Sequence, residues 1–464
     1  SCFVFSALTT GAPLSESVDA GVGIQTGDNE RFMRQFCELS AISGDWIPVC
    51  RSPAVTSTWG GRNLLLQWGD GRGEFFRFVE ARLGAGRTGA WIRGLWAWDK
   101  SGVVISRMGN LPATLYSGHA FPDNSIVLVP TKGSDLASLW AFVSSDEFSS
   151  KVRDIDPGLS LSPGTVTQVP FDVDRWRAVA EERWPDGLPE PWSDDATQWL
   201  FEGRPEVACQ PLQVGVGRLL GYRWPEQGEG DDLDGLADED GVVCLPSLLG
   251  EPPAAQRLEQ LLARAFGGTW TPNRTVELLE AAGSAKTDLS LWLRDEFFKD
   301  HCQVFGNRPF VWHIWDGRKD GFAALVNYHR LDRTNLERLT YTYLGDWIER
   351  QQAGVADETA GAEDRLAAAV DLQRRLGLVL DGEPPYDIYV RWKHLAEQPI
   401  GWDPDINDGV RLNVRPFVEA GVLRNKFNVH WKKDRGKNPD GSERHNDLHH
   451  TTTDKHNARN NPKP

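Results

Sequence analysis

The stretch SIVLVPTKGSDLASLWAFVSSDEFSSKVRDI (residues 125–155) decides the fold class of this chain. Its first part, Ser125–Pro130, is an apolar run rich in β-branched residues, which predicts a strand. From Asp135 to Ile155 the apolar residues recur at helical spacing, and Asp135 is placed to cap the start of one amphipathic helix. A strand followed closely by such a helix predicts mixed α and β structure.

The residues before this stretch predict a loop-rich β region. Short apolar runs alternate with glycines between residues 46 and 130, which is the pattern of strands joined by turns. We expect strands at 63–68, 74–83 and 102–108, and a strand-like run at 90–100. Upstream, ERFMRQFCEL (30–39) has helical spacing, and after the predicted helix TVTQVPFD (165–172) predicts a strand.

The residues after about 175 predict mainly helices. Helical periodicity occurs at 174–184, 211–224, 253–268, 288–305, 335–352 and 362–380. Gly267 suits the position just after a helix end. Residues 308–331 predict a β-hairpin, because two apolar runs are joined by the turn sequence DGRKDG. We expect the last two helices to form an antiparallel pair, and YDIYVRW (386–392) to form a strand.

Together these patterns predict a multidomain α+β chain, in which a mixed, β-rich domain precedes a helical and α/β C-terminal region. A length of 464 residues is enough for about three domains. We predict a lead-in at 1–45, a β-rich domain at 46–175, a helical acidic region at 176–305, an α/β region at 306–423 and a polar, poorly ordered basic tail at 424–464.

The composition excludes several classes of protein. Hydrophobic residues make up 40% of the chain and charged residues 25%, which excludes a wholly disordered or collagen-like protein. No run of 18 apolar residues occurs, so we expect no transmembrane helix and no membrane partner. The six cysteines include no CxxC pair, which argues against a disulfide scaffold or a zinc site and favours the cytoplasm. Because residue 1 is Ser, we expect this to be the back part of a longer protein.

The net charge of −16 hides two basic zones around an acidic middle. Residues 51–110 hold nine Lys/Arg against four Asp/Glu, and residues 424–464 hold ten against five. Residues 181–300 instead hold ten Lys/Arg against 24 Asp/Glu. This asymmetry leaves contact with nucleic acid open despite the acidic total.

Four motifs resemble ligand sites but favour simpler interpretations. GAGRTG (84–89) matches a dinucleotide-binding pattern, yet an aromatic, strand-like run follows it where a helix is needed. EPPY (383–386) is close to the [DNS]PP[YFW] loop of amino-methyltransferases, but its Glu is one methylene too long, which favours a Pro-Pro turn. The acidic loop 226–241 lacks the ligand order of a calcium site, and HNDLHH (445–450) favours a solvated tail over a metal site.

Tryptophan is unusually frequent, with 20 copies. Trp91, Trp96 and Trp98 are interleaved with cations between residues 87 and 107. This pattern suits nucleic acid, because guanidinium groups reach phosphates or guanine edges while indole rings stack on an extruded base. Packing inside a β region explains the same tryptophans, and the local sequence favours packing.

Several segments, taken together and in order along nearly the whole chain, resemble one family. They are GIQTGDNERF (23–32), SRMGNLPATLY (106–116), LWAFVSSDEF (139–148), VTQVPFDVDRW (166–176), LPEPWSDDATQWLF (188–201), PLQVGVGRLLGYRWP (211–225), RPFVWHIWDGRKDGFAALVNYHRLD (308–332), LTYTYLGDWIERQ (339–351), YDIYVRWKHLAEQPIGW (386–402), GVRLNVRPF (409–417) and KKDRGKNPDGSERHNDLH (432–449). These segments resemble the C-terminal half of very large single-chain adenine-N6 DNA methyltransferases. That family belongs to type IIG restriction–modification systems and to the BREX (PglX-type) and DISARM phage-defence systems.

The resemblance implies that different parts of the protein have different functions. The domain that binds S-adenosyl-L-methionine (AdoMet) and carries the NPPY loop would lie upstream, so this chain alone would be inactive and would bind no AdoMet. Residues 46–175 would be a target recognition domain for double-stranded DNA. Residues 176–464 would brace that domain and contact the DNA backbone. Other subunits of the defence system are further expected partners.

The resemblance also gives the two basic zones a function. We expect DNA contacts in the recognition domain from Arg87, Arg93, Trp98, Arg107 and Asn110. We expect phosphate contacts in the tail from Lys432, Lys433, Arg435 and Lys437. We expect no catalytic, cofactor-binding or metal-binding residue in the chain.

Two other functions remain open from the sequence. In the first, the chain is a stand-alone phage-defence interaction module whose acidic middle docks a partner or mimics the charge of DNA. A DNA reader would bind duplex with salt-sensitive affinity, whereas a mimic would bind a basic partner and ignore DNA. In the second, the tryptophans form a glycan-binding module, which is weaker because nothing in the sequence signals secretion.

Overall fold

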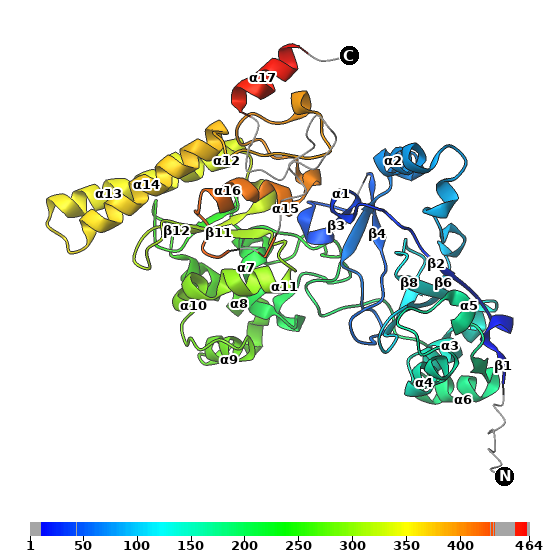
Figure 1. Cartoon of the computed structure of the whole chain (residues 1–464). Helices are drawn as coiled ribbons and strands as arrows, with labels where there is room; N and C mark the ends of the chain where they lie inside the picture. Colours follow the sequence, from blue (N-terminus) through cyan, green and yellow to red (C-terminus); the bar gives the residue numbers. More distant parts are fainter. Residues whose placement is uncertain (1–10, 43, 427, 430, 432–450, 462–464) are drawn as a thin grey trace, which may run out of the picture. The chain divides into compact units, whose positions relative to one another are not determined.

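The computed structural model describes residues 11–42, 44–426, 428–429, 431 and 451–461 (Figure 1). It divides the chain into two compact units. Unit 1 comprises the described residues up to Phe36 together with 41–193 and 198–200, and unit 2 comprises 37–40, 194–197 and the described residues from Phe201 onward. Each unit combines helices with small antiparallel sheets, which confirms the predicted multidomain α+β class.

Unit 1 is built on a four-stranded antiparallel sheet with the strand order β2-β8-β6-β7. Its strands are β2 (Val18–Val22), β6 (Ser101–Ser106), β7 (Ala113–Ser117) and β8 (Ser125–Pro130). A second sheet has the order β3-β5-β4, with β3 (Met33–Gln35), β4 (Trp46–Val49) and β5 (Leu64–Gln67). The strands predicted at 63–68, 102–108 and 125–130 are therefore confirmed. A further short pair joins β1 (Ala12–Pro13) to β9 (Pro170–Phe171).

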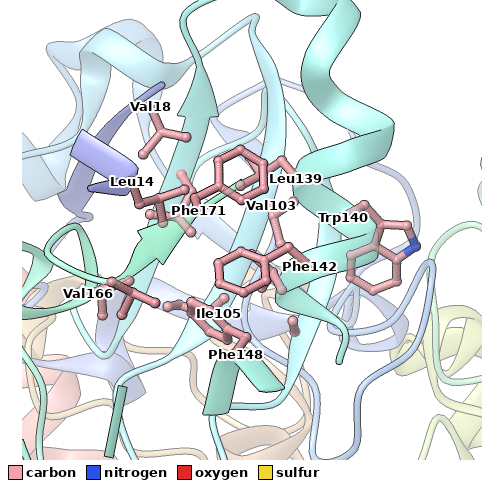
Figure 2. Close-up of a cluster of buried hydrophobic side chains, with 14 of the residues drawn as sticks. Leu14, Val18, Val103, Ile105, Leu139, Trp140, Phe142, Phe148, Val166 and Phe171 are labelled. Atoms are coloured by element: carbon pink, nitrogen blue, oxygen red, sulfur yellow. The ribbon is translucent and has the colours of Figure 1, made fainter. Parts of the chain in front are cut away.

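The main core of unit 1 lies between the four-stranded sheet and a set of helices. The helices are α3 (Leu136–Val143), α4 (Asp146–Ile155), α5 (Pro163–Val166) and α6 (Val173–Arg183). Val103 and Ile105 of β6 are fully buried in this cluster with Leu139 and Phe142 of α3 (Figure 2). Burying each such side chain contributes about 1.5–3 kcal/mol, so this layer stabilises the unit.

The predicted single helix from Asp135 to Ile155 is wrong, because the chain forms two helices that meet at Ser144 and Ser145. The Ser145 hydroxyl accepts a hydrogen bond from the Phe148 amide and so caps the start of α4. Asp135 caps nothing with its side chain, because its carboxylate pairs with Arg177 at 3.0 Å. A serine inside the apolar pattern therefore starts a new helix.

Four other expectations for unit 1 are also wrong. Residues 74–83 form the helix α2 (Glu74–Leu83), because Phe75 and Val79 are buried four residues apart, on one helix face. The predicted helix at 30–39 ends with α1 (Asn29–Phe32), since the next three residues pair with β5 as strand β3. The strand-like run at 90–100 forms turns, including the 3-10 turns Thr88–Ala90 and Leu95–Ala97. The strand predicted at 165–172 is reduced to β9, which follows α5.

Unit 2 contains a three-stranded antiparallel sheet with the order β10-β12-β11. Its strands are β10 (Val242–Cys244), β11 (Val311–Trp315) and β12 (Ala323–Asn327). The predicted hairpin is confirmed, and Asp316 closes its turn by accepting hydrogen bonds from the backbone amides of Arg318 and Phe322. The first helices of the unit are α7 (Pro211–Leu219), α8 (Ala254–Phe266), α9 (Arg274–Ala281), α10 (Leu289–Asp295) and α11 (Phe297–Val304). The helix predicted at 288–305 is thus divided at Glu296.

The later part of unit 2 contains a long helical hairpin, seen clearly in Figure 1. Its helices are α13 (Leu344–Ala356) and α14 (Ala362–Asp381), and the predicted antiparallel pair is confirmed. The helix α12 (Arg333–Arg338) leads into it through a π-helical turn, and α15 (Val410–Asn413) and α16 (Arg415–Glu419) follow it. No strand forms at 386–392, because the backbone of Val390 bonds to the side chain of Gln398 instead of to a neighbouring strand.

The end of the described chain is helical rather than poorly ordered. Helix α17 (Thr452–Asn460) begins at Thr451, which caps it together with Asp454. The Lys455 ammonium lies 2.6 Å from the Asp387 carboxylate, and both side chains are almost fully buried. Lys455 also donates hydrogen bonds to the carbonyls of Ile388 and Pro399. Residues 452–460, in the tail predicted to be poorly ordered when alone, therefore form a helix that is held by contacts with residues 387–399.

Candidate nucleic-acid interface

Two of the predicted DNA contacts, Arg93 and Arg107, meet at Asp123 in unit 1. Arg107 follows β6, and its guanidinium donates to the carbonyls of Leu161 (2.8 Å) and Asp123 (3.0 Å). The guanidinium of Arg93 lies 3.9 Å from the Asp123 carboxylate. Both arginine side chains are half-buried, but only Arg107 uses donors in hydrogen bonds to the protein, since 3.9 Å is too long for such a bond. Arg107 therefore braces the loop at Asp123, whereas Arg93 makes only an electrostatic contact with its carboxylate.

Asn110 lies in the exposed turn between β6 and β7. Gly109 and Leu111 on either side of it have left-handed backbone angles (φ +63° and +55°), which make the turn tight. Arg153 supports the turn from α4 by donating to the Gly109 carbonyl. Next to Asn110, the Met108 side chain is 56% exposed. The side chain of Asn110 is therefore exposed, and its predicted contact with DNA stays a prediction.

The three tryptophans of residues 91–98 have different environments. Trp98 is half-buried and packs edge-on against Trp68, with ring centroids 5.0 Å apart. Trp91 is also half-buried, and its ring covers Gly27 so closely that a side chain at that glycine would overlap it. Trp98 is thus mainly a packing residue, which is the alternative that the local sequence favours. Trp96 differs, because its side chain is exposed.

Helix α2 and the segments on either side of it carry exposed cations. Among them is Arg87, which the sequence singled out. The others are Arg72, Arg77, Arg82 and Lys100. Within the part of the chain that the structure describes, none of these five forms an ion pair with a carboxylate. Recognising 74–83 as a helix would have revealed Arg77 and Arg82, because the buried positions of α2 leave them on its outer side.

One arginine of the same basic zone, Arg62, is fully buried and adds nothing to the surface charge. Its guanidinium donates to the carbonyls of Gly60 (2.9 Å) and Leu115 (2.7 Å), and it lies 4.8 Å from the ring centroid of Trp59. It therefore joins the segment before β5 to β7. Counting charges along the sequence cannot separate such a structural arginine from an exposed one.

The predicted phosphate contacts of the tail, Lys432, Lys433, Arg435 and Lys437, lie outside the described residues, as does HNDLHH (445–450). GAGRTG (84–89) follows helix α2 and not a strand, which agrees with its interpretation as a turn. EPPY (383–386) directly follows α14 and closes a tight turn, in which the Tyr386 amide donates to the Glu383 carbonyl at 2.6 Å.

The acidic loop 226–241 of unit 2 is folded around arginines. Arg218 of α7 is almost fully buried and pairs with Asp231 (3.0 Å) and Asp234 (2.9 Å). Arg264 of α8 pairs with Asp232 at 2.8 Å. Asp231, Asp232 and Arg264 border a pocket of about 650 Å³ whose remaining charged lining is mostly acidic. Much of the acidic charge is therefore neutralised within the unit.

The described residues lack two features, a cluster of metal-binding side chains and a helix that could span a membrane. Nowhere in that part of the chain do three or more His, Cys, Asp or Glu side chains gather as a metal ion would require. None of its helices has both the length and the apolar character needed to cross a lipid bilayer.

Sequence comparison finds similarity to two adenine-specific methyltransferases. The chain is 29% identical over 141 residues to the adenine-specific methyltransferase BrxX of Escherichia coli O9:H4 (strain HS), which is 29% of this chain and 11% of BrxX. It is 32% identical over 193 residues to the adenine-specific methyltransferase PglX of Lacticaseibacillus casei (strain Zhang), which is 39% of this chain and 15% of PglX. No protein-family model matches the chain.

Structural comparison matches the type IIL restriction–modification enzyme MmeI, solved in complex with DNA, over 60% of this chain and 37% of that one, with 14% identity and a TM-score of 0.23. A TM-score this low gives no basis for transferring geometry between the two. The sequence matches are more informative, although each spans only a small share of a much longer enzyme. Over part of its length, this chain is therefore similar to adenine-specific methyltransferases of the BrxX and PglX kind.

Proposed function

We propose that this chain recognises duplex DNA for an AdoMet-dependent adenine-N6 DNA methyltransferase of a restriction–modification or phage-defence system. The similarity to BrxX and PglX carries the proposal. The residues that bind AdoMet and transfer the methyl group are, in this proposal, not among the 464 residues of the chain. The chain alone then has no methyltransferase activity.

Residues 46–175 act in this proposal as the target recognition domain. The exposed cations from Arg72 to Lys100 support this role, since they are free of ion pairs to carboxylates within the described residues. Phosphate contacts of this kind supply affinity and fix the position of the protein along the DNA. A few side chains at base edges supply sequence specificity. Asn110 is suited to the second task, because an amide can bond to the edge of adenine. The tail cations Lys432, Lys433, Arg435 and Lys437 add contacts to the DNA backbone.

Duplex binding measured over a range of salt concentrations tests the proposal. A fluorescent duplex of mixed sequence is titrated with the full chain between 50 and 300 mM salt, and the logarithm of the affinity is plotted against that of the salt concentration. We expect a falling line, whose slope is about −0.9 for each phosphate contacted. No binding at any salt concentration would contradict the proposal and favour the interaction module or DNA mimic.

A methylation assay tests the second part of the proposal. The chain is incubated with radiolabelled AdoMet and adenine-containing duplex, with a known adenine methyltransferase as positive control. We expect no transfer of label to DNA by this chain. Transfer would show that catalytic residues are present after all.

A further inference from the structure

Trp96 is an exposed aromatic side chain on a supported surface. It belongs to the 3-10 turn Leu95–Ala97, and 38% of its surface is exposed. Its neighbour Leu95 is 45% exposed. Two large apolar side chains of one short turn thus face water. Trp91 and Trp98 are both less exposed, so packing does not account for Trp96 as it does for them.

The indole ring of Trp96 rests on the backbone of strand β2. A methyl group placed on Gly21 would lie 3.1 Å from two ring atoms, Cζ2 and Nε1. Gly21 therefore lets the ring lie directly against the strand. Because Gly21 is paired with Val127 of β8, the surface under the ring belongs to the four-stranded sheet. An aromatic ring held in this way loses little conformational entropy when a ligand stacks on it.

The charges around Trp96 favour an anionic ligand with a flat face. The Lys100 ammonium lies 5.5 Å from the ring centroid, and Lys100 is exposed. Lys100, like Arg87 of the preceding loop, forms no ion pair to a carboxylate within the described part of the chain. The ammonium lies over the ring, and Lys100 is an exposed, flexible side chain that can leave the ring for a phosphate when a nucleotide base stacks on the indole.

We propose that Trp96 stacks on a base extruded from the bound duplex, and that Lys100 contacts a phosphate of the same strand. This inference rests on the proposed function and adds to it the aromatic contact of the recognition surface. Trp96 supplies binding energy that is insensitive to salt, because stacking releases no counterions. Lys100 supplies energy that falls as the salt concentration rises.

The salt titration of the full chain separates these two contributions. For Trp96→Ala we expect affinity at least about fivefold weaker at every salt concentration, with an unchanged slope, because one base-stacking contact is lost. Trp96→Phe keeps an aromatic ring and should lose less. For Lys100→Ala we expect the slope to become shallower by about one unit. Trp192→Ala is the matched control, since Trp192 is a 48% exposed tryptophan of the same unit.

The possible outcomes distinguish this inference from the proposed function. If the wild-type chain binds duplex and Trp96→Ala binds as tightly as Trp192→Ala, the stacking contact is wrong and the proposed function stands. If Trp96→Ala changes the salt slope of DNA binding and Trp96→Phe does not restore affinity, stacking is wrong. Trp96 then acts by holding nearby cations in position. If the wild-type chain does not bind duplex at all, the proposed function is wrong and the inference falls with it. Thermal melting shows whether each variant is folded.

Discussion

The guanidinium of Arg107 donates a hydrogen bond of 3.0 Å to the main-chain carbonyl of Asp123. A second bond from the same side chain reaches the Leu161 carbonyl at 2.8 Å. One arginine thus connects the end of β6 to the loop before β8 and to the segment before α5. An arginine that the sequence presents as a DNA contact is, in the folded chain, a connection between three backbone segments.

This geometry predicts that Arg107→Ala destabilises unit 1. Two hydrogen bonds from a charged donor are lost, and we expect the free energy of unfolding to fall by about 2 kcal/mol. Urea denaturation followed by circular dichroism measures the change. Arg87→Ala is the control, because Arg87 is exposed and should leave the stability within about 0.5 kcal/mol of wild type. Unchanged stability of Arg107→Ala together with a shallower salt slope for DNA binding would make Arg107 a phosphate contact instead.

We expect Arg62 to contribute more than Arg107 to the stability of unit 1. It is fully buried, and it donates to two main-chain carbonyls beside the ring of Trp59. In Arg62→Met these carbonyls lose their charged partner, and we expect the free energy of unfolding to fall by about 3 kcal/mol. Arg72→Met, at an exposed position, is the matched substitution and should have little effect. Equal stability of the two variants would show that the buried guanidinium contributes nothing.

His119 makes the stability of unit 1 depend on pH. Burial and the nearby positive charge of Arg62 lower the pKa of His119 to about 4, from its usual value of 6.5. Between pH 6.5 and pH 4 the unfolded chain therefore binds a proton that the folded chain does not, so this contribution to stability is lost as the pH falls. We expect the free energy of unfolding of wild type to drop, relative to His119→Gln, by up to about 3 kcal/mol across this range. A constant difference between the two proteins from pH 7 to pH 4 would contradict the prediction.

The buried pair of Lys455 and Asp387 is expected to hold helix α17 in place. Lys455→Ala leaves the Asp387 carboxylate buried without its ammonium partner, and breaking such a pair typically costs about 3–5 kcal/mol. We expect faster amide hydrogen exchange at residues 386–399 and 452–460, which mass spectrometry of peptic fragments resolves. His456→Ala changes an exposed residue of the same helix and should leave the exchange unchanged. Slow exchange in Lys455→Ala would show that other contacts suffice to anchor the helix.

The sequence predicts well those elements whose pattern is both local and consistent. The strands at 102–108 and 125–130 and the hairpin at 308–331 are apolar runs bounded by turn residues. The helical pair of α13 and α14 has long periodic patterns and a short link. In each of these segments the local preferences of neighbouring residues agree with one another. The tertiary contacts therefore preserve the structure that the local sequence favours.

The sequence identifies only part of the proposed DNA-binding surface. Composition reveals the basic zone of residues 51–110 and the unusual tryptophans, but it treats every arginine as equal. Arg62 is buried, Arg107 is hydrogen-bonded within unit 1, and Arg87 is exposed, although all three belong to one basic stretch. Only the positions of their neighbours in space distinguish them.

By itself, the sequence determined the α+β class, the longest strands and helices, and the placement of basic zones around an acidic middle. The tertiary structure decided that residues 33–35 form a strand, because β5 supplies their hydrogen-bonding partners across about thirty residues of chain. It also decided that Trp98 is half-buried while Trp96 is exposed, because Trp68 packs edge-on against the Trp98 ring whereas the Trp96 ring lies against the backbone of Gly21. Hydrogen bonding within a helix and hydrophobic periodicity are local and can be read along the chain. Strand pairing and burial depend on residues that are distant in sequence, and they exist only once the chain has folded.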